Sequence, residues 1–210
     1  MKIAVVCAAG KEGTLLVKEA LQRGHEVTAI VRDGTRIPKA SHALVKDLFD
    51  LTYDDLKGND VVIDAFGAWT EDVLPQHSTS LKHLCDILSG TDIRLLVVGG
   101  AGSLYVNPQH TVCVADGPDF PDIFKPLAAA MAKALNELRA RKDVRWTYLS
   151  PATDFQADGP RTGRYILGGE ELTLNSKGEN SISYADYAVA MIDEVEKGQY
   201  IAKRFSVVGE

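Results

Sequence analysis

The sequence predicts an α/β fold, a doubly wound parallel sheet with helices on both faces. Apolar, β-branched runs alternate along the chain with segments whose apolar residues recur at helical spacing. The links between these segments are short, and the apolar runs are continuous rather than interrupted by polar residues. Strands of that kind are buried on both faces, as in a parallel sheet whose crossovers are helices.

The first half of the chain supplies most of the expected sheet. The helical pattern of the first crossover opens at Leu15 and stops at Gly24, and Thr52 is expected to cap a single helical turn. Apolar residues keep a helical period over 75–88. Strands are predicted at the apolar runs, over residues 3–6, 26–31, 43–45, 60–64 and 94–98.

The second half opens with a long irregular loop over residues 104–126, which contains several prolines and few helix formers. In a compact domain such a loop is usually functional or mobile. Short apolar pieces at 165–167 and 172–174 predict a small strand pair. The other expected elements are a helix over 126–141, strands over 144–149 and 205–208, and a helix that runs to Lys197 from a capping box of Ser183 and Asp186.

Length and composition set the class of protein. A chain of 210 residues fits one domain, 1–210, with a small substrate-side region at about 152–182. The net charge is −6, which argues against a general nucleic-acid binder because such proteins carry a basic face. No apolar stretch approaches the roughly 20 residues of a membrane span. Three scattered cysteines favour free thiols, so we expect a cytoplasmic protein.

The segment over residues 2–14, KIAVVCAAGKEGT, predicts a strand, a tight turn and a helix start. A dinucleotide-binding domain begins in this way, because the turn lets the backbone approach a pyrophosphate and the helix N-terminus offers it N–H groups. The usual turn has three glycines. Here Gly10 and Gly13 are present, and Cys7 stands in place of the first. The position of Lys11 before Gly13 does not match a P-loop.

Ligands of a doubly wound sheet bind at the carboxyl ends of the strands, so the residues after each strand form the candidate site. Glycine recurs there, either because a ligand approaches the backbone or because glycines close turns. The predicted cofactor-binding residues are Ala9, Gly10, Lys11, Glu12, Gly13, Arg32, Asp47, Leu48, Ala65, Phe66, Gly67, Gly99, Gly100 and Pro151.

Arg32 bears on the choice of cofactor. Domains selective for NAD(H) usually place an acidic residue at the end of the second strand, against the ribose 2′-hydroxyl. An arginine there suits a 2′-phosphate instead, although a solvated surface arginine is the alternative and Asp33 is adjacent. We therefore expect NADP(H) as the preferred cofactor and NAD(H) as the second choice.

The residues for acid catalysis are incomplete. Many short-chain dehydrogenases use Tyr-x-x-x-Lys on the helix after the fifth strand, where this chain has Lys133 but Ala129 in place of the tyrosine. Tyr53 and Lys57 have the spacing but lie before the fourth strand, so they are interpreted as structural. Ser103 is the catalytic candidate, as a contact of nicotinamide or substrate, with a plain turn serine as the alternative. The histidines show no metal-ligand spacing, and no metal is predicted.

Together these segments resemble an atypical short-chain dehydrogenase/reductase with a Rossmann-like fold. The similarity is to NADH-flavin reductase-like, biliverdin-IXβ reductase-like and NmrA-like NAD(P)-binding proteins, and it covers nearly the whole chain. The segments that carry it are residues 10–13, 23–32, 46–50, 64–67, 98–104 and 149–151.

The resemblance implies a role for each part of the site. It implies that residues 10–13 hold the pyrophosphate and that Arg32 meets the 2′-phosphate. It further implies that residues 47–48 lie by the adenine, that 65–67 follow the ribose and pyrophosphate, and that Ser103 and the stretch after Pro151 face the nicotinamide and substrate.

Two functions fit these expectations. The first is an NAD(P)H-dependent reductase that passes a hydride to a flavin, quinone or similar conjugated small molecule under the 104–125 loop. Such acceptors need no strong active-site acid, which agrees with the missing tyrosine. The alternative is a non-catalytic NADP(H)-binding redox sensor of the NmrA-like kind. An epimerase or lyase fits less well, because the tyrosine is absent.

Overall fold

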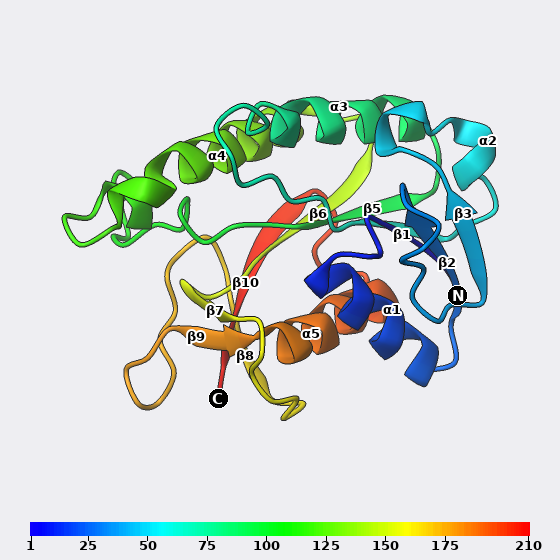
Figure 1. The fold of residues 1–210 in the computed structure, drawn as a ribbon. Helices are drawn as coiled ribbons and strands as arrows, with labels where there is room; N and C mark the ends of the chain where they lie inside the picture. The colour runs from blue at the N-terminus through cyan, green and yellow to red at the C-terminus, as the bar shows by residue number, and fades with distance from the viewer.

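A computed structural model describes residues 1–210 and contains one eight-stranded sheet in the order β3-β2-β1-β4-β5-β6-β10-β8 (Figure 1). All neighbours in this sheet are parallel except β10 and β8, which are antiparallel. The strands are β1 (Lys2–Val6), β2 (Glu26–Val31), β3 (His42–Val45), β4 (Val61–Asp64), β5 (Arg94–Val98), β6 (Arg145–Ser150), β8 (Tyr165–Gly168) and β10 (Lys203–Gly209). The predicted α/β fold is confirmed.

Helices cover both faces of the sheet. In Figure 1, α3 and α4 lie above it and α1 and α5 lie below it. Two separate apolar cores result, and β1 contributes Ile3 and Val5 to the core under α1 and α5, and Ala4 and Val6 to the other. The helices are α1 (Lys11–Gln22), α2 (Tyr53–Leu56), α3 (Gln76–Leu88), α4 (Lys125–Ala140) and α5 (Tyr184–Lys197), with short 3-10 turns η1 (Leu48–Asp50), η2 (Val114–Asp116) and η3 (Asp122–Phe124).

The chain order reverses between β1 and β4. From β1 the chain builds outward through β2 to β3, then returns to place β4 on the other side of β1 and continues through β5 and β6. At such a switch point the loops after the two neighbouring strands diverge, which opens a crevice outside their carboxyl ends. The topology therefore positions a ligand site at the ends of β1 and β4.

Local sequence accounts for the helix ends. Thr52 caps α2 as expected, and it does so in a capping box with Asp55. Ser183 accepts a hydrogen bond from the N–H of Asp186 at the start of α5, as expected. The first helix begins at Lys11, earlier than the expected Leu15, so Gly13 lies inside its first turn.

The predicted strand pair of residues 165–167 and 172–174 is wrong. Residues 165–168 form β8, which pairs with β10 at the edge of the main sheet, and 172–174 form no strand. The two-stranded sheet consists instead of β7 (Asp154–Gln156) and β9 (Ser181–Ser183), which are parallel. The last strand, β10, is longer than expected, and without β8 its outer edge would expose unpaired backbone N–H and C=O groups. The apolar segment 165–168 pairs with that edge.

None of the helices in the structure is both long enough and apolar enough to span a membrane.

Candidate functional site

The candidate site lies along the edge where the parallel strands end. The N–H of Ala8, just after β1, donates to the carbonyl of Ile30 in β2 over 3.1 Å. On the other side of β1, the N–H of Ala65 donates to the carbonyl of Val6 over 3.2 Å. These bonds hold the ends of the three strands side by side. The structure thus brings the predicted residues after β1, β2 and β4 to one edge.

The turn after β1 is tight, and its first residue is strained. Cys7 has a φ of 59°, in the left-handed region where a Cβ atom crowds the backbone and glycine is favoured. The N–H of Gly10 donates to the carbonyl of Cys7 over 3.0 Å and closes the turn. A positive φ at this position explains why the usual three-glycine turn has glycine there. In this chain Cys7 adopts that positive φ.

Gly13 is required by the approach of α1 to β1. A Cβ atom built on Gly13 would lie 2.5 Å from the carbonyl oxygen of Cys7 and 2.9 Å from Cα of Ala8. The helix begins at the cap residue Gly10, which has no side chain to accept from the first-turn N–H groups. Those groups and the positive end of the helix dipole fit a pyrophosphate.

Glu12 is a buried acid in this same turn. Its side chain has neither carboxylate oxygen hydrogen-bonded, and the residue is only 7% exposed. Burial raises the pKa of Glu12 well above its usual value, and the phenols of Tyr184 and Tyr187 lie close enough to be affected by its charge. This shift favours the neutral form of the acid, which repels an anion at the start of α1 less than an ionised carboxylate does.

Two arginines lie in the segment that follows β2. Arg32 follows β2 and is exposed, as predicted. Arg36, in the next loop, donates from Nη2 to the carbonyl of Ala9 over 3.4 Å. Asp33 accepts from the N–H of Thr35 over 2.9 Å, so its carboxylate is engaged within its own loop. Arg36 was not among the predicted site residues. Its position close to Arg32 in the sequence was the only feature that pointed to it.

Asp47 and Leu48 form the turn after β3. Asp47 accepts from the N–H of Phe49 over 2.9 Å and caps η1. Leu48 is buried in the core under α3. One carboxylate oxygen of Asp47 is therefore committed to the fold, while the turn itself lies at the expected edge.

The segment after β4 leaves room beside its backbone. Ala65 and Phe66 are half-buried, and Gly67 is exposed. A Cβ atom on Gly67 would meet only the indole Nε1 of Trp69, at 3.6 Å. Packing within the protein does not require this glycine, which is compatible with the approach of a ligand.

Asp64, the last residue of β4, is a second buried acid that sequence reasoning missed. It is 4% exposed and accepts from the N–H of Phe66 over 3.0 Å. Burial raises the pKa of Asp64 to about 6. A cavity of about 20 Å³ beside it is also lined by Ser80 and Tyr148.

The glycines after β5 are explained by packing inside the protein. A Cβ atom on Gly99 would lie 2.2 Å from a ring carbon of Tyr148, and one on Gly100 would lie 2.9 Å from the sulfur of Met131. The N–H of Gly100 donates to the hydroxyl of Tyr148 over 3.1 Å. The hydroxyl of Tyr187 donates to the carbonyl of Leu149 over 2.7 Å. Close packing inside the protein, which neither of the two explanations for recurrent glycine anticipated, accounts for the glycines at these positions.

Ser103 is held by an arginine from the other end of the chain. Arg204 donates from Nη1 to the carbonyl of Ser103 over 3.0 Å and to its Oγ over 2.9 Å. The hydroxyl accepts this bond and keeps its own hydrogen. The predicted role of Ser103 as a nicotinamide or substrate contact stays a prediction, with the oxygen already oriented by Arg204.

Pro151 is buried at the end of β6, and the segment after it packs against the start of α5. The ring of Phe155 lies 3.9 Å from that of Tyr184 and 4.9 Å from that of Tyr187, centroid to centroid. These aromatic contacts fix the segment after Pro151 to the start of α5, close to the acid Glu12.

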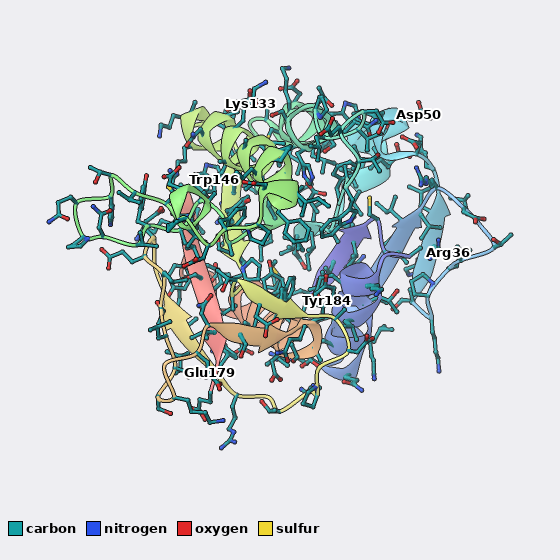
Figure 2. The ribbon with its side chains drawn as sticks, turned by 60° about the vertical axis from the view of Figure 1, so that its left-hand side comes forward. Arg36, Asp50, Lys133, Trp146, Glu179 and Tyr184 are labelled. Carbon is teal, nitrogen blue, oxygen red and sulfur yellow. The ribbon has the colours of Figure 1, made fainter.

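No Tyr–Lys pair faces this edge. Lys133 points away from the sheet on the outer side of α4, where it pairs with Glu137 at 3.7 Å (Figure 2). Tyr53 is exposed, and Lys57 pairs with Asp54 at 2.8 Å. No group of three or more His, Cys, Asp or Glu side chains is arranged to hold a metal ion.

Gly13→Ala should displace α1 from β1 and weaken NADPH binding, because the new Cβ atom meets backbone atoms that cannot rotate away. We expect a stability loss of roughly 1–3 kcal/mol in denaturant unfolding. The control is Gly169→Ala, whose Cβ atom would meet nothing within 4 Å. Equal stability and NADPH affinity in the two variants would contradict the close-approach interpretation.

Asp64→Asn should stabilise the protein in a pH-dependent way. The pKa of Asp64 is raised from 3.8 to about 6 on folding, so stability is lost as pH rises from about 4 to about 6 and stays lower above it. The variant keeps an oxygen for the N–H of Phe66 and lacks this loss. We expect a gain of about 2–3 kcal/mol at pH 7 and none at pH 3. Urea unfolding at both pH values measures it, and a pH-independent difference would refute the assignment.

Comparisons with known proteins agree with this geometry. The chain matches the NAD(P)H-binding family over residues 7–197. It is 43% identical to the uncharacterized protein YwnB of Bacillus subtilis (strain 168), over all of this chain and 99% of YwnB. It is 26% identical to a 3-diazoavenalumate denitrifying reductase of a Streptomyces species, over 90% of this chain and 70% of that protein.

A solved structure shares the fold from end to end. SP1627 of Streptococcus pneumoniae TIGR4, named as a proposed NADH-flavin reductase, is 52% identical, with a TM-score of 0.97 over 100% of both chains. The resemblance drawn from the sequence is thus confirmed: the chain belongs to the NAD(P)H-binding family, among atypical short-chain dehydrogenase/reductase proteins.

Proposed function

We propose that the protein is an NAD(P)H-dependent reductase that passes a hydride to a flavin, a quinone or a similar conjugated small molecule. The observation that carries the proposal is the turn of residues 7–13, in which α1 approaches β1 so closely that Gly13 admits no Cβ atom. That turn lies at the switch point of the sheet and presents a helix N-terminus without a side-chain cap.

The residues of the site bind and orient rather than supply an acid. A bound nicotinamide cofactor would supply the hydride. The first turn of α1 would hold the pyrophosphate, and the segment after β4 would pass along the ribose. Ser103, oriented by Arg204, and the segment after Pro151 would face the nicotinamide and the acceptor.

The absence of a Tyr–Lys pair favours conjugated acceptors. A flavin or quinone spreads the incoming negative charge over its ring system and takes its proton from solvent, so positioning of two planar rings suffices. SP1627 is named as a proposed NADH-flavin reductase, and the Streptomyces relative is named as a reductase. Both names support reduction as the reaction class.

We further propose NADP(H) as the preferred cofactor. Arg32 is exposed at the end of β2, and Arg36 reaches back to the turn that follows β1. Asp33, the acid that could accept from a ribose hydroxyl, is engaged with Thr35. Two guanidinium groups, beside an acid that is hydrogen-bonded within its own loop, suit a 2′-phosphate better than a ribose hydroxyl.

A redox sensor is the second candidate. The outward position of Lys133 and the lack of a tyrosine at residue 129 favour it, because they leave the cofactor without the usual acid. A sensor would bind NADP⁺ and NADPH with different affinities and would not turn over.

Arg32→Ala and Arg36→Ala should each weaken NADPH binding more than NADH binding, because only NADPH carries the 2′-phosphate. We expect a difference of about 1–3 kcal/mol for each lost charge-assisted contact. Fluorescence titration of the two cofactors measures it. Arg164→Ala serves as the control, since Arg164 is an exposed arginine that pairs with Glu210. Equal losses for NADPH and NADH in the site variants would contradict the phosphate assignment.

The purified protein should oxidise NADPH faster than buffer does when FMN, riboflavin or a quinone is added. Absorbance of NADPH follows the reaction, and Gly13→Ala serves as the impaired variant for comparison. Tight NADPH binding without any acceptor-dependent oxidation would refute the reductase. A difference between NADP⁺ and NADPH affinity in that case would support the sensor.

A further inference from the structure

A basic hollow of about 370 Å³ lies on the α4 side of the sheet, where β6 and β10 run side by side. Trp146, which belongs to it, lies near the start of β10 below the α4 ribbon in Figure 2. None of its residues belongs to the predicted cofactor site. We define the basic hollow by its lining residues Arg139, Lys142, Trp146, Glu170, Ala202, Lys203 and Arg204.

The charge in the basic hollow is unbalanced. Four of its lining residues are cationic and one is anionic, in a chain whose net charge is −6. Glu170 is shared between Arg139, at 2.5 Å, and Arg204. The amino group of Lys142 donates only to the carbonyl of Arg139, over 3.2 Å, and no carboxylate pairs with Lys142 or Lys203. Positive charge is therefore in excess, and it is concentrated in a concave surface.

Two lining residues also have buried donors that find no acceptor. The indole Nε1 of Trp146 and the guanidinium Nε of Arg204 make no hydrogen bond, although these residues are only 3% and 4% exposed. Buried donors of this kind are costly, and a buried indole N–H is usually partnered. Unpartnered donors beside uncompensated cations call for a ligand that is both negatively charged and a hydrogen-bond acceptor.

We propose that the basic hollow binds a small oxyanion, a phosphate or carboxylate group, at a site separate from the dinucleotide. Lys142 and Lys203 attract the anion at the rim, and a small shift of the wall residues Arg204 and Trp146 brings their unpartnered N–H groups to it. The volume admits a group larger than a single oxyanion, so a small organic phosphate or polycarboxylate fits.

Arg204 connects this site to the edge of the sheet. The same guanidinium that lines the basic hollow donates to the carbonyl and the hydroxyl of Ser103. An anion that draws Arg204 toward it loosens or reorients Ser103. Binding of an anion in the basic hollow therefore changes the position of Ser103 in the loop after β5.

The test uses the two tryptophans of the 210-residue chain, each with one indole N–H signal in a ¹⁵N–¹H spectrum. Inorganic phosphate and citrate are titrated separately at millimolar concentrations, with ionic strength held constant by chloride. Saturating NADPH is present, so that the pyrophosphate turn is occupied. We expect a saturable shift of the Trp146 signal and none of the Trp69 signal, since Trp69 is 70% exposed outside the basic hollow. Trp146→Phe assigns the signal.

Two variants decide the outcome. Lys142→Ala combined with Lys203→Ala should weaken the apparent affinity at least about tenfold. Lys133→Ala, on the same helix but outside the basic hollow, should leave it unchanged. A Trp146 signal that does not move with either anion overturns the proposal, as does an equal response in the double variant. A response to phosphate alone or to citrate alone identifies which oxyanion the site takes.

Discussion

The fold depends on the contact between the first turn of α1 and the end of β1. Gly13 lies against the carbonyl of Cys7, and this approach sets where α1 begins and how it covers the sheet. β1 pairs with both β2 and β4, so the position of its last residues also sets the switch point. Cys7 has a positive φ at this contact, where its carbonyl accepts from the N–H of Gly10 and closes the turn that leads into α1.

Two buried acids, Glu12 and Asp64, lie at the same edge, and burial changes the pKa of each. Burial raises the pKa of Glu12 and so disfavours a negative charge where a pyrophosphate would bind. Asp64 has a pKa of about 6 and is mostly ionised at neutral pH. Burial and the charge of Asp64 raise the pKa of the neighbouring Cys7 thiol to about 12, so Cys7 remains protonated and is not a nucleophile. The cysteine in the turn is thus a steric substitute for glycine rather than a reactive group.

Patterns within short segments predicted most of the fold, whereas contacts between distant segments did not follow from the sequence. Continuous apolar runs predicted the seven strands of the parallel part of the sheet, because burial on both faces favours such runs. The pairing of residues 165–168 depended on the free edge of β10, some forty residues later along the chain. Likewise, the environment of Ser103 is set by Arg204, and the glycine at 99 by Tyr148; such partners have no local signal in the sequence.

The two buried tyrosines near the edge, Tyr148 and Tyr187, hold the backbone in place and are poor proton donors. The hydroxyl of Tyr187 donates to the carbonyl of Leu149, and burial raises the pKa of Tyr187 well above its usual value. Tyr148 accepts from the N–H of Gly100, and burial raises its pKa as well. Neither phenol has a lysine beside it to lower its pKa, because Lys133 faces outward. Both hydroxyls fix the backbone that forms the floor of the site. These two phenols are therefore unsuited to protonate an acceptor that needs a strong acid. An acceptor that delocalises its own negative charge does not need them to.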